Sequence, residues 1–271
     1  MKLFFLLLLF SYTFATNFTG KVVFLTGGSS GIGFATSLGF ARAGATVIFI
    51  ARDEHPDWYN GADAERKIKT DPQVIAANGT AKFIKADIRN LDEIKNVINF
   101  IHNNYGTIDI AVNNAGIGGM LGKMHEIPDN YTFGEHDPIY NNLYGTFNCM
   151  QQEVKYWYNH SRNGTMINLS SYNGIRACPT ASMYSASKHG IIGLTESIAL
   201  EYASGTPTIR ANFTQNSTLW EQFKPLCEQD LPNGRLGDPS EMAAIIMFLA
   251  SDEASYISGT TISGDFGLSA R

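Results

Sequence analysis

The 271-residue chain is poor in cysteine and has little excess charge. Its cysteines are three, Cys149, Cys178 and Cys227. Three widely spaced cysteines make neither a disulfide framework nor a zinc-binding pattern, so we interpret them as small buried hydrophobic residues. The formal net charge is −5 and no basic run stands out, which excludes an electrostatic surface for nucleic acid. The six histidines are scattered, so metal-assisted hydrolysis has no ligand cluster and no metal site is predicted.

Internal repeats, low-complexity blocks and linkers are absent as well. The length therefore fits one large domain, with enough chain to bury a core without disulfides or structural metals.

The first 15 residues differ in kind from the rest. Lys2 gives a short positive region, residues 3–10 are apolar, and residues 13–15 read Thr-Phe-Ala, a cleavage site of the small-residue type. The apolar stretch is shorter than the ~20 residues that span a bilayer. A cleaved signal peptide is favoured over an uncleaved membrane anchor, and a cytosolic protein with an apolar tail is the third interpretation.

Acceptor triplets for N-glycosylation give partial support to an exported protein. The triplets begin at Asn17, Asn78, Asn130, Asn159, Asn163, Asn168, Asn212 and Asn216. Asn168 and Asn212 lie in or beside expected buried strands, where a glycan would not fit. We expect the surface acceptors to be Asn17, Asn78, Asn130 and the region 159–163.

Apolar runs alternate with stretches of helical periodicity from residue 21 onward. The expected strands are 21–27, 45–51, 81–87, 108–116, 165–171, 208–214 and 259–265. The expected helices are 33–44, which closes on Gly44, then 91–106, 139–158, 182–204 and 239–251. This alternation predicts a single α/β domain, a Rossmann-type doubly wound parallel sheet with helices on both faces. Three irregular stretches remain, 52–73, 118–137 and 215–238, the last of which is where a substrate lid is expected.

The stretch "TGGSSGIG" places Gly27, Gly31 and Gly33 between the first strand and the first helix. Such a turn lets backbone amides approach a pyrophosphate at the positive end of the helix. Tight-turn packing without a ligand is the plainer interpretation of the same glycines.

The next strand ends in "IFIARD", where dinucleotide-binding folds meet the adenosine ribose. Ala51 stands at the usual acidic position and Arg52 follows it. A guanidinium pairs with a 2′-phosphate, so the sequence favours NADP, while Asp53 keeps NAD possible. A solvated surface charge is the alternative for Arg52. Asp87 ends a further strand and is a candidate acceptor for the adenine amino group.

"MYSASKHG" places Tyr184 and Lys188 four residues apart, on one face of the expected helix. A tyrosine titrates near pH ~10, and a nearby ammonium lowers that pKa toward the range useful for proton transfer. Ser170 and Ser171 end a strand where a hydroxyl can hold a substrate oxygen. Asn142 lies in a helical stretch and can fix a water or backbone group behind the lysine.

Together these motifs resemble the short-chain dehydrogenase/reductase family. "TGGSSGIG", "NNAG" (113–116), "NLYG", a serine thirteen residues before the tyrosine and "YSASK" stand in that family's order and roughly its spacing. The C-terminal stretch from "GRLGDPSEM" to "ISGDFG" is also similar. The resemblance covers about residues 20–268, which we take as the NAD(P)-binding domain.

The resemblance implies a catalytic tetrad of Asn142, Ser171, Tyr184 and Lys188. Tyr184 would be the general acid/base, and Lys188 would lower its pKa and bind the nicotinamide ribose. Ser171 would orient the substrate oxygen, and Asn142 would support a proton relay through water. The thirteen-residue interval selects Ser171 over Ser170.

The resemblance also implies the cofactor contacts. They are Gly27, Ser29, Ser30, Gly31, Ile32, Gly33, Arg52, Asp87, Asn114, Ala115 and Gly116, together with Tyr184 and Lys188.

One segment departs from the family pattern. After the sixth expected strand the family usually shows a Pro-Gly turn that grips the nicotinamide, and this chain has Asn216 and Ser217 there. Glu221 takes the later threonine position, for which Thr218 is a partial substitute. Asn tolerates turn geometry, so the loop can persist with an altered grip.

The sequence therefore predicts an NADP(H)-preferring oxidoreductase that interconverts an alcohol and a carbonyl on a small molecule. The alternative is a non-catalytic nucleotide-binding or interaction protein with a degraded nicotinamide clamp. The residues expected to line the substrate site are both apolar and polar, so steroid, retinoid, fatty and small aliphatic carbonyls all stay possible as substrates. From the resemblance we expect a homo-oligomer built on helices 139–158 and 182–204. The leader favours the endoplasmic reticulum lumen or secretion, with membrane tethering through residues 3–14 as the alternative.

Overall fold

The computed structural model describes residues 17–52, 60–205, 207–216 and 231–270. The leader (1–15), Asp53, Ser217, Thr218, Glu221 and Cys227 lie outside these described residues, as does most of the expected lid.

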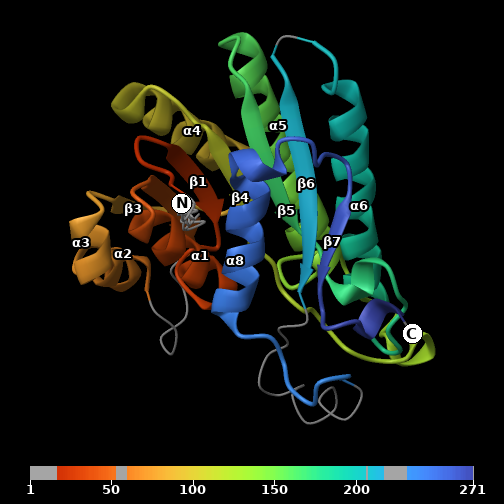
Figure 1. Ribbon diagram of the computed structural model, residues 1–271. Coiled ribbons are helices and arrows are strands. Elements are labelled where there is room, and N and C mark those ends of the chain that lie inside the picture. The colour runs from red at the N-terminus through yellow and green to blue at the C-terminus, as the bar shows by residue number, and fades with distance from the viewer. Residues whose placement is uncertain (1–16, 53–59, 206, 217–230, 271) are drawn as a thin grey trace, which may run out of the picture.

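A seven-stranded sheet forms the centre of the molecule (Figure 1). Its strands run in the order β3-β2-β1-β4-β5-β6-β7, and all neighbours pair in parallel. The strands are β1 (Val22–Thr26), β2 (Thr46–Ala51), β3 (Thr80–Lys85), β4 (Ile110–Asn113), β5 (Gly164–Leu169), β6 (Ile209–Asn216) and β7 (Thr261–Gly264). The order reverses between β1 and β4, so the predicted doubly wound parallel sheet is confirmed.

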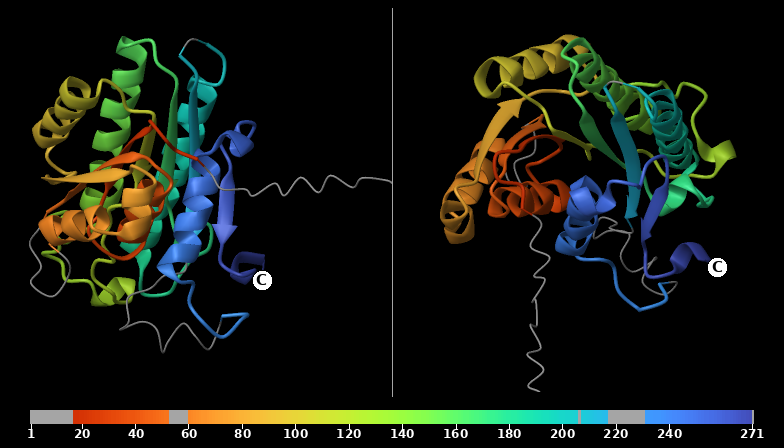
Figure 2. Two further views of the ribbon diagram at one scale, coloured as in Figure 1. Left: turned by 60° about the vertical axis from the view of Figure 1, so that its left-hand side comes forward. Right: turned by 45° about the horizontal axis from the view of Figure 1, so that its top comes forward.

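Helices cover both faces of this sheet, giving three layers (Figure 2). The α-helices are α1 (Gly31–Arg42), α2 (Gly61–Lys69), α3 (Pro72–Ala76), α4 (Leu91–Tyr105), α5 (Gly145–Asn159), α6 (Ser182–Glu201) and α8 (Pro239–Ala250). Single turns are η1 (Met124–Glu126), η2 (Ile139–Tyr144), η3 (Tyr172–Gly174), η4 (Asp252–Ala254) and η5 (Leu268–Ala270). Helices α1 and α8 pack on one face, and α4, α5 and α6 on the other.

The two-residue period of the strands divides the apolar side chains between these layers. On β1, Val23 and Leu25 pack with the α1–α8 layer, whereas Val22 and Phe24 pack with the α4–α5–α6 layer. All four are buried, which explains why this strand reads as a continuous apolar run.

Local sequence signals set several helix ends. Asn90 accepts hydrogen bonds from the backbone N–H groups of Asp92 and Glu93 at the start of α4, and Gly106 ends that helix in the left-handed region. The chain leaves α1 through Gly44, whose φ of +88° suits glycine, as the sequence predicts.

Three expectations differ from the structure. The stretch 52–73, expected to be irregular, contains helix α2 and the start of α3. The strand expected at 108–116 ends at Asn113, because the backbone of Asn114 and Ala115 turns to bond the Thr26 side chain. The helix expected at 139–158 begins with a π-helical turn, η2, before it continues as α5.

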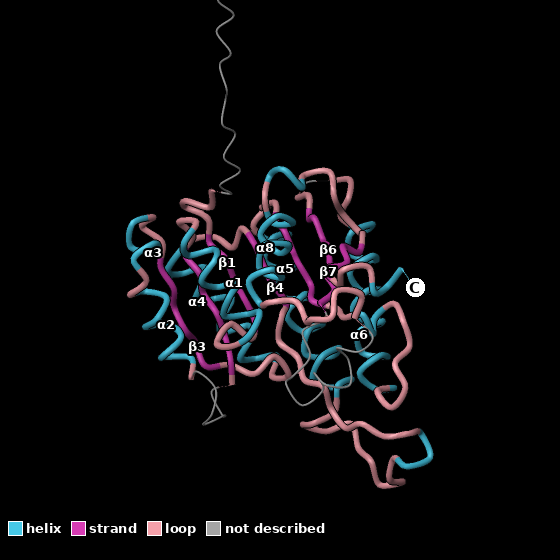
Figure 3. The backbone as a smooth tube through the Cα atoms, turned by 60° about the horizontal axis from the view of Figure 1, so that its bottom comes forward, coloured by secondary structure: helices cyan, strands magenta, loops and turns pink. Residues whose placement is uncertain are grey.

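All strands end at one edge of the sheet, which we call the carboxyl edge. Figure 3 turns this edge toward the viewer, and loops lie across the strand ends. Open parallel sheets bind ligands at this edge, where the strand order reverses. Within the described residues no helix has the length and apolar character to span a bilayer.

Candidate active site

The glycine loop after β1 is shaped by close backbone contacts. Gly27 has a φ of +70° and donates its N–H to Ile50 O at 2.8 Å. A Cβ on Gly33 would lie 2.0 Å from Gly27 O, so α1 packs against the loop at a distance that only glycine permits. Gly31 also has positive φ, and no atom lies within 4 Å of the position of its absent Cβ.

The start of α1 is open to a ligand. Ser30 is the N-cap residue in extended conformation, and its side chain makes no capping hydrogen bond. The first turn contains no acidic residue. Free N–H groups at a helix start attract anions, so this turn fits the pyrophosphate of a dinucleotide.

The segment after β4 braces the loop from the other side. Thr26 Oγ1 accepts from the N–H groups of Asn114 and Ala115, each at 3.0 Å. The Asn114 amide donates to the carbonyl oxygens of Thr26 and Gly27, both at 3.1 Å. The predicted cofactor residues on β1 and β4 are thus joined in one hydrogen-bonded unit.

Ser171 and Tyr184 meet at the carboxyl edge beside this unit. Ser171 is buried, follows β5 and caps η3 by accepting from Asn173 N at 3.2 Å. Tyr184 lies in the first turn of α6, close enough to Ser171 for that side chain to lower its pKa. Ser170 turns away and donates to Lys188 O at 2.9 Å. The structure therefore places Ser171 beside the tyrosine, and Ser170 is committed to a backbone group.

Lys188 lies one turn further along α6 and is buried. Its ammonium donates to Leu169 O at 2.8 Å and lies 5.7 Å from the centroid of the Tyr184 ring. Burial lowers the pKa of Lys188 to about 8. The lysine is thus held at the end of β5 by a backbone carbonyl that the sequence analysis did not foresee.

The expected effect of Lys188 on Tyr184 is wrong for this structure. Burial raises the pKa of Tyr184 above its ordinary value, and the hydrogen bond with Ser171 offsets only part of that rise. The ammonium is directed at Leu169 O, and burial lowers its own pKa to about 8. The i,i+4 spacing shows that the two residues share a face, but it does not show where the ammonium points.

Asn142 lies in the π turn η2 with no exposed surface. Its amide donates to Ile117 O at 2.8 Å and to Ser187 Oγ at 3.3 Å, and its oxygen accepts from Ile117 N at 2.7 Å. Ser187 in turn donates to Tyr184 O at 2.7 Å. Asn142 therefore ties the loop after β4 to the helix turn that carries the tyrosine. π-helical turns of this kind are frequent at functional sites.

Gly116 lies between the two halves of the site. A Cβ there would be 3.2 Å from Asn142 Oδ1 and 3.6 Å from Lys188 Nζ. The predicted cofactor segment and the predicted tetrad are thus adjacent.

Beneath the site lies a buried polar chain that the sequence analysis missed. Asn113 donates to Glu153 Oε2 and to Asn168 Oδ1, both at 2.9 Å. Asn168 then donates to Thr195 Oγ1 at 2.9 Å. Burial raises the pKa of Glu153 to about 8, and its Oε1 makes no hydrogen bond. A glutamate in an amphipathic helix reads as a surface residue, so only the tertiary packing reveals this one.

The second and third strands end in charged residues. Arg89 Nε donates to both oxygens of Asp87 at 2.9 Å, and this guanidinium lowers the pKa of Asp87. Arg52 lies 3.9 Å from Glu135 Oε1. Asp87 keeps acceptor capacity, since a carboxylate accepts about four hydrogen bonds, but adenine would share it with Arg89.

Other predictions concern residues outside the site. Asn168 and Asn212 are fully buried, as expected of acceptors that glycan cannot reach. Asn78 and Asn130 are exposed. Cys149 is buried as expected, whereas Cys178 is only partly buried and does not fit that expectation. In the described part of the chain no three histidine, cysteine, aspartate or glutamate side chains gather to hold a metal.

Comparisons with known proteins agree with this geometry. The family model described as enoyl-(acyl carrier protein) reductase matches residues 27–269. A 3-oxoacyl-(acyl-carrier-protein) reductase of Thermotoga maritima is 37% identical over 260 residues, which cover 92% of this chain and 98% of that protein. A 3beta-hydroxysteroid dehydrogenase of Mediterraneibacter gnavus is 31% identical, covering 93% of this chain and 95% of that protein.

Solved structures give the same result. A short chain dehydrogenase from Bacillus anthracis superposes with a TM-score of 0.79 at 32% identity, covering 92% of this chain and 96% of that one. Levodione reductase superposes with a TM-score of 0.79 at 28% identity, covering 94% and 99%.

Proposed function

Because this chain belongs to the short-chain dehydrogenase/reductase family, we propose that it is an NADP(H)-preferring oxidoreductase. It interconverts an alcohol and a carbonyl, with Tyr184 as the general acid/base. The observation that carries the proposal is the Ser171 side chain close enough to Tyr184 to lower its pKa, with the Lys188 ammonium 5.7 Å from the tyrosine ring. Oxidoreductases with both reductase and dehydrogenase names are among the relatives.

A bound nicotinamide supplies the hydride. The chain's own groups handle the oxygen and the proton. The hydroxyls of Ser171 and Tyr184 converge, so a substrate carbonyl oxygen that bonds to both is oriented and polarised. Tyr184 then gives its proton to this oxygen as the carbonyl carbon becomes an alcohol carbon. In the reverse direction the same tyrosine takes the alcohol proton.

Burial raises the pKa of Tyr184, so the tyrosine is protonated at neutral pH and carries the proton that carbonyl reduction needs. Lys188 binds the end of β5 through Leu169 O. Asn142 binds the helix turn that carries the tyrosine, through Ser187.

The NADP preference rests on the charges beside the ribose position. Arg52 and Arg89 place two guanidinium groups at the ends of β2 and β3, and both approach the same oxygen of Glu135. Guanidinium groups bind phosphate in bidentate fashion. Ala51 leaves no acid at the place where NAD-specific enzymes bind the 2′-hydroxyl.

Substitution of Tyr184 by Phe tests the reaction. The variant should lose roughly 10²–10⁴-fold of carbonyl reduction, the usual contribution of a general acid, and should bind NADPH as the wild type does. The panel should contain 3-oxoacyl thioesters, 3-ketosteroids and small aliphatic ketones. The first two are chosen because one relative is named a 3-oxoacyl reductase and another a 3beta-hydroxysteroid dehydrogenase. Turnover that survives in Tyr184→Phe would contradict this mechanism.

A non-catalytic nucleotide-binding protein is the second candidate, favoured by Asn216 and Ser217 in place of the usual Pro-Gly turn. NADPH binding without turnover on any substrate of the panel would select it over the oxidoreductase.

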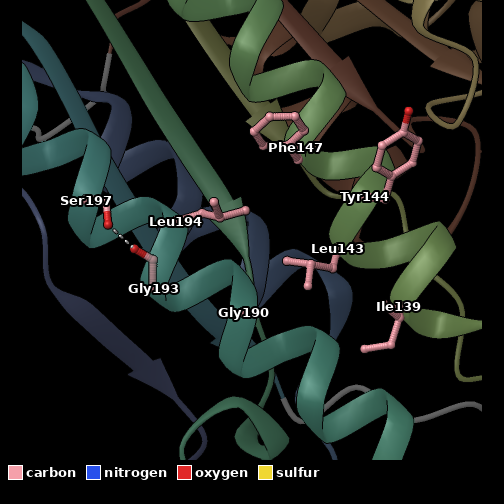
Figure 4. A pocket seen from close by; sticks show the side chains of 8 residues that line it. All are labelled: Ile139, Leu143, Tyr144, Phe147, Gly190, Gly193, Leu194 and Ser197. Atoms are coloured by element: carbon pink, nitrogen blue, oxygen red, sulfur yellow. Dashed lines mark hydrogen bonds between the residues drawn. The ribbon is translucent and has the colours of Figure 1, made fainter.

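We also propose that the chain forms a homo-oligomer through η2, α5 and α6. A pocket of about 440 Å³ lies between these helices, and Figure 4 shows the side chains that line it. Tyr144 and Phe147 are exposed beside Gly190 and Gly193 on α6. Large and small residues on one face suit a two-fold interface, in which each copy offers both. Relatives in this family are often oligomers.

Gly193→Arg tests this interface, because no atom lies within 4 Å of the new Cβ and the chain should still fold. We expect light scattering to give twice the chain mass for the wild type and the monomer mass for the variant. Ala203→Arg, just past the end of α6, is the charge-matched control and should remain dimeric. A dimer that persists in Gly193→Arg contradicts the interface.

For location, we propose that the leader directs the chain to the endoplasmic reticulum lumen. The exposed acceptors Asn78 and Asn130 support this proposal. N-terminal sequencing of protein from the native host, with a glycosidase shift, checks it: an intact Met1 and no shift would remove it.

A further inference from the structure

Four charged side chains gather where β2 and β3 end. Arg52 follows β2, Asp87 and Arg89 follow β3, and Glu135 comes from the loop before η2. Glu135 Oε1 lies 3.9 Å from Arg52 Nη1 and 3.5 Å from Arg89 Nη2. Two positive and two negative groups make the cluster neutral as it stands.

The two guanidinium groups are held differently. Arg89 donates from Nε to both oxygens of Asp87 at 2.9 Å and from Nη1 to Glu135 O at 3.1 Å, so its plane is fixed. Within the described residues, Glu135 is the ion-pair partner of Arg52. The guanidinium groups of Arg52 and Arg89 can therefore bind a further anion on the side where the Glu135 carboxylate lies.

The Glu135 carboxylate is loosely held, although its backbone is fixed. Its side chain is 56% exposed, and its Oε1 lies 3.9 Å from Arg52 and 3.5 Å from Arg89, distances longer than those of a strong charged hydrogen bond. Its carbonyl oxygen accepts from Arg89 and, at 3.3 Å, from Asn141 Nδ2. The carboxylate can therefore turn into solvent by side-chain rotation alone.

We propose that Glu135 is a specificity-determining residue that competes with the cofactor's 2′-phosphate for Arg52 and Arg89. The carboxylate occupies the position between the two guanidinium groups that a phosphate needs. A 2′-phosphate carries about −1.5 to −2 charges at neutral pH, and it must displace the carboxylate or be repelled by it. A 2′-hydroxyl carries no charge and meets neither cost, so Glu135 moderates the discrimination between NADPH and NADH. This inference rests on the proposed NADP preference.

Binding of cofactor fragments tests the proposal without any need for turnover. Adenosine 2′,5′-bisphosphate and AMP differ only in the 2′-phosphate that Glu135 is proposed to oppose, and titration calorimetry on the full chain gives both affinities. Glu135→Gln should tighten bisphosphate binding by about fivefold, the scale of one exposed ion pair, and leave AMP binding unchanged. Glu126→Gln removes the same charge from the same loop, away from the arginines, and should change neither.

Arg52→Met separates the failure of this inference from that of the proposed preference. If Arg52→Met weakens the bisphosphate selectively but Glu135→Gln leaves it unchanged, or tightens both fragments equally, the competition is overturned and the preference stands. If the wild type binds the fragment with the 2′-phosphate no more tightly than the one without it, and Arg52→Met does the same, the NADP preference itself is wrong. The role of Glu135 is then wrong with it. Thermal unfolding of each variant confirms that it is folded.

Discussion

The two halves of the carboxyl edge are stabilised by different means. Around Gly27 and Gly33 the backbone itself is crowded, and the hydrogen bonds from Asn114 and Ala115 lock the loop. Around Tyr184 and Lys188 the groups are side chains removed from water, with shifted pKa values. A substitution in the first half should therefore act through sterics, and one in the second through desolvation or lost chemistry.

This difference explains why the two halves differ in how they can change. In the glycine loop the backbone segments lie so close together that a side chain would clash with its neighbours. The second half needs particular atoms, so a change of one hydroxyl is enough to alter it. The predictions below test this contrast in order of decreasing effect.

The neighbouring serines offer the sharpest test of the chemical half. Ser171→Ala should lower carbonyl reduction by roughly 10²–10³-fold, as removal of one oxyanion donor does, with NADPH affinity unchanged. Ser170→Ala removes the hydrogen bond to Lys188 O, a carbonyl that lies inside α6, and should cost about 1 kcal/mol of unfolding free energy with a smaller loss of rate. Steady-state kinetics and denaturant unfolding of both variants measure the contrast. Equal losses of rate would break it.

Two glycines test the steric half. Gly33→Ala places a Cβ 2.0 Å from Gly27 O, so it should cost about 3 kcal/mol of unfolding free energy, the upper end for overpacking, and abolish NADPH binding. Gly31→Ala meets no atom but keeps a φ of +51° and should cost about 1 kcal/mol. Urea unfolding gives both values. If Gly31→Ala proves the more damaging, conformation rather than crowding controls the loop.

Glu153 carries the effect on stability that depends most on pH. Its pKa is about 8 in the folded chain and about 4.3 when unfolded, so the folded state binds the extra proton between these values. Stability should then fall as pH rises from about 4.3 to 8. Lys188, whose pKa is about 8 folded and about 10.4 unfolded, acts in the next window, where stability should rise with pH.

Thermal unfolding across pH 5–10 checks these opposite slopes, which together give a minimum near pH 8. Glu153→Gln keeps the shape and the hydrogen bond from Asn113 and should flatten the acidic slope alone. An unchanged slope in Glu153→Gln would show that other groups cause it. Asn104→Asp, an exposed change on α4, is the control for charge.

Much of the fold follows from the sequence, because its signals are local and regular. The strands around Val23 and Ile48 are continuous apolar runs, and their order along the chain predicts a doubly wound sheet that the structure confirms. Membership of the family is likewise confirmed by the comparisons. The positions of Ser171 and Tyr184 were predicted from motif spacing, and the structure brings the two together.

The contacts that could not be predicted from the sequence depend on how side chains of different elements point toward one another in the folded chain. Leu169 O fixes Lys188, Arg89 fixes Asp87, and Glu153 is buried beneath the site. None of these has a local pattern, because each joins residues on different elements or depends on burial that the helix period does not reveal. The predicted direction of the Tyr184 pKa shift was wrong for this reason. The spacing of residues in the sequence shows neither how far the tyrosine is buried from water nor where the Lys188 ammonium points.

The parallel sheet gives the molecule a polarity with two unlike ends. The described chain enters at the beginning of β1, where Phe18 N bonds Ala43 O and Thr46 N bonds Lys21 O. The proposed catalytic residues, Ser171 and Tyr184, lie at the opposite end, where the strands finish. Whatever precedes Asn17 therefore joins the fold at the end remote from Tyr184. A leader attached there can be trimmed or fastened to a surface while the reacting end still faces its substrate.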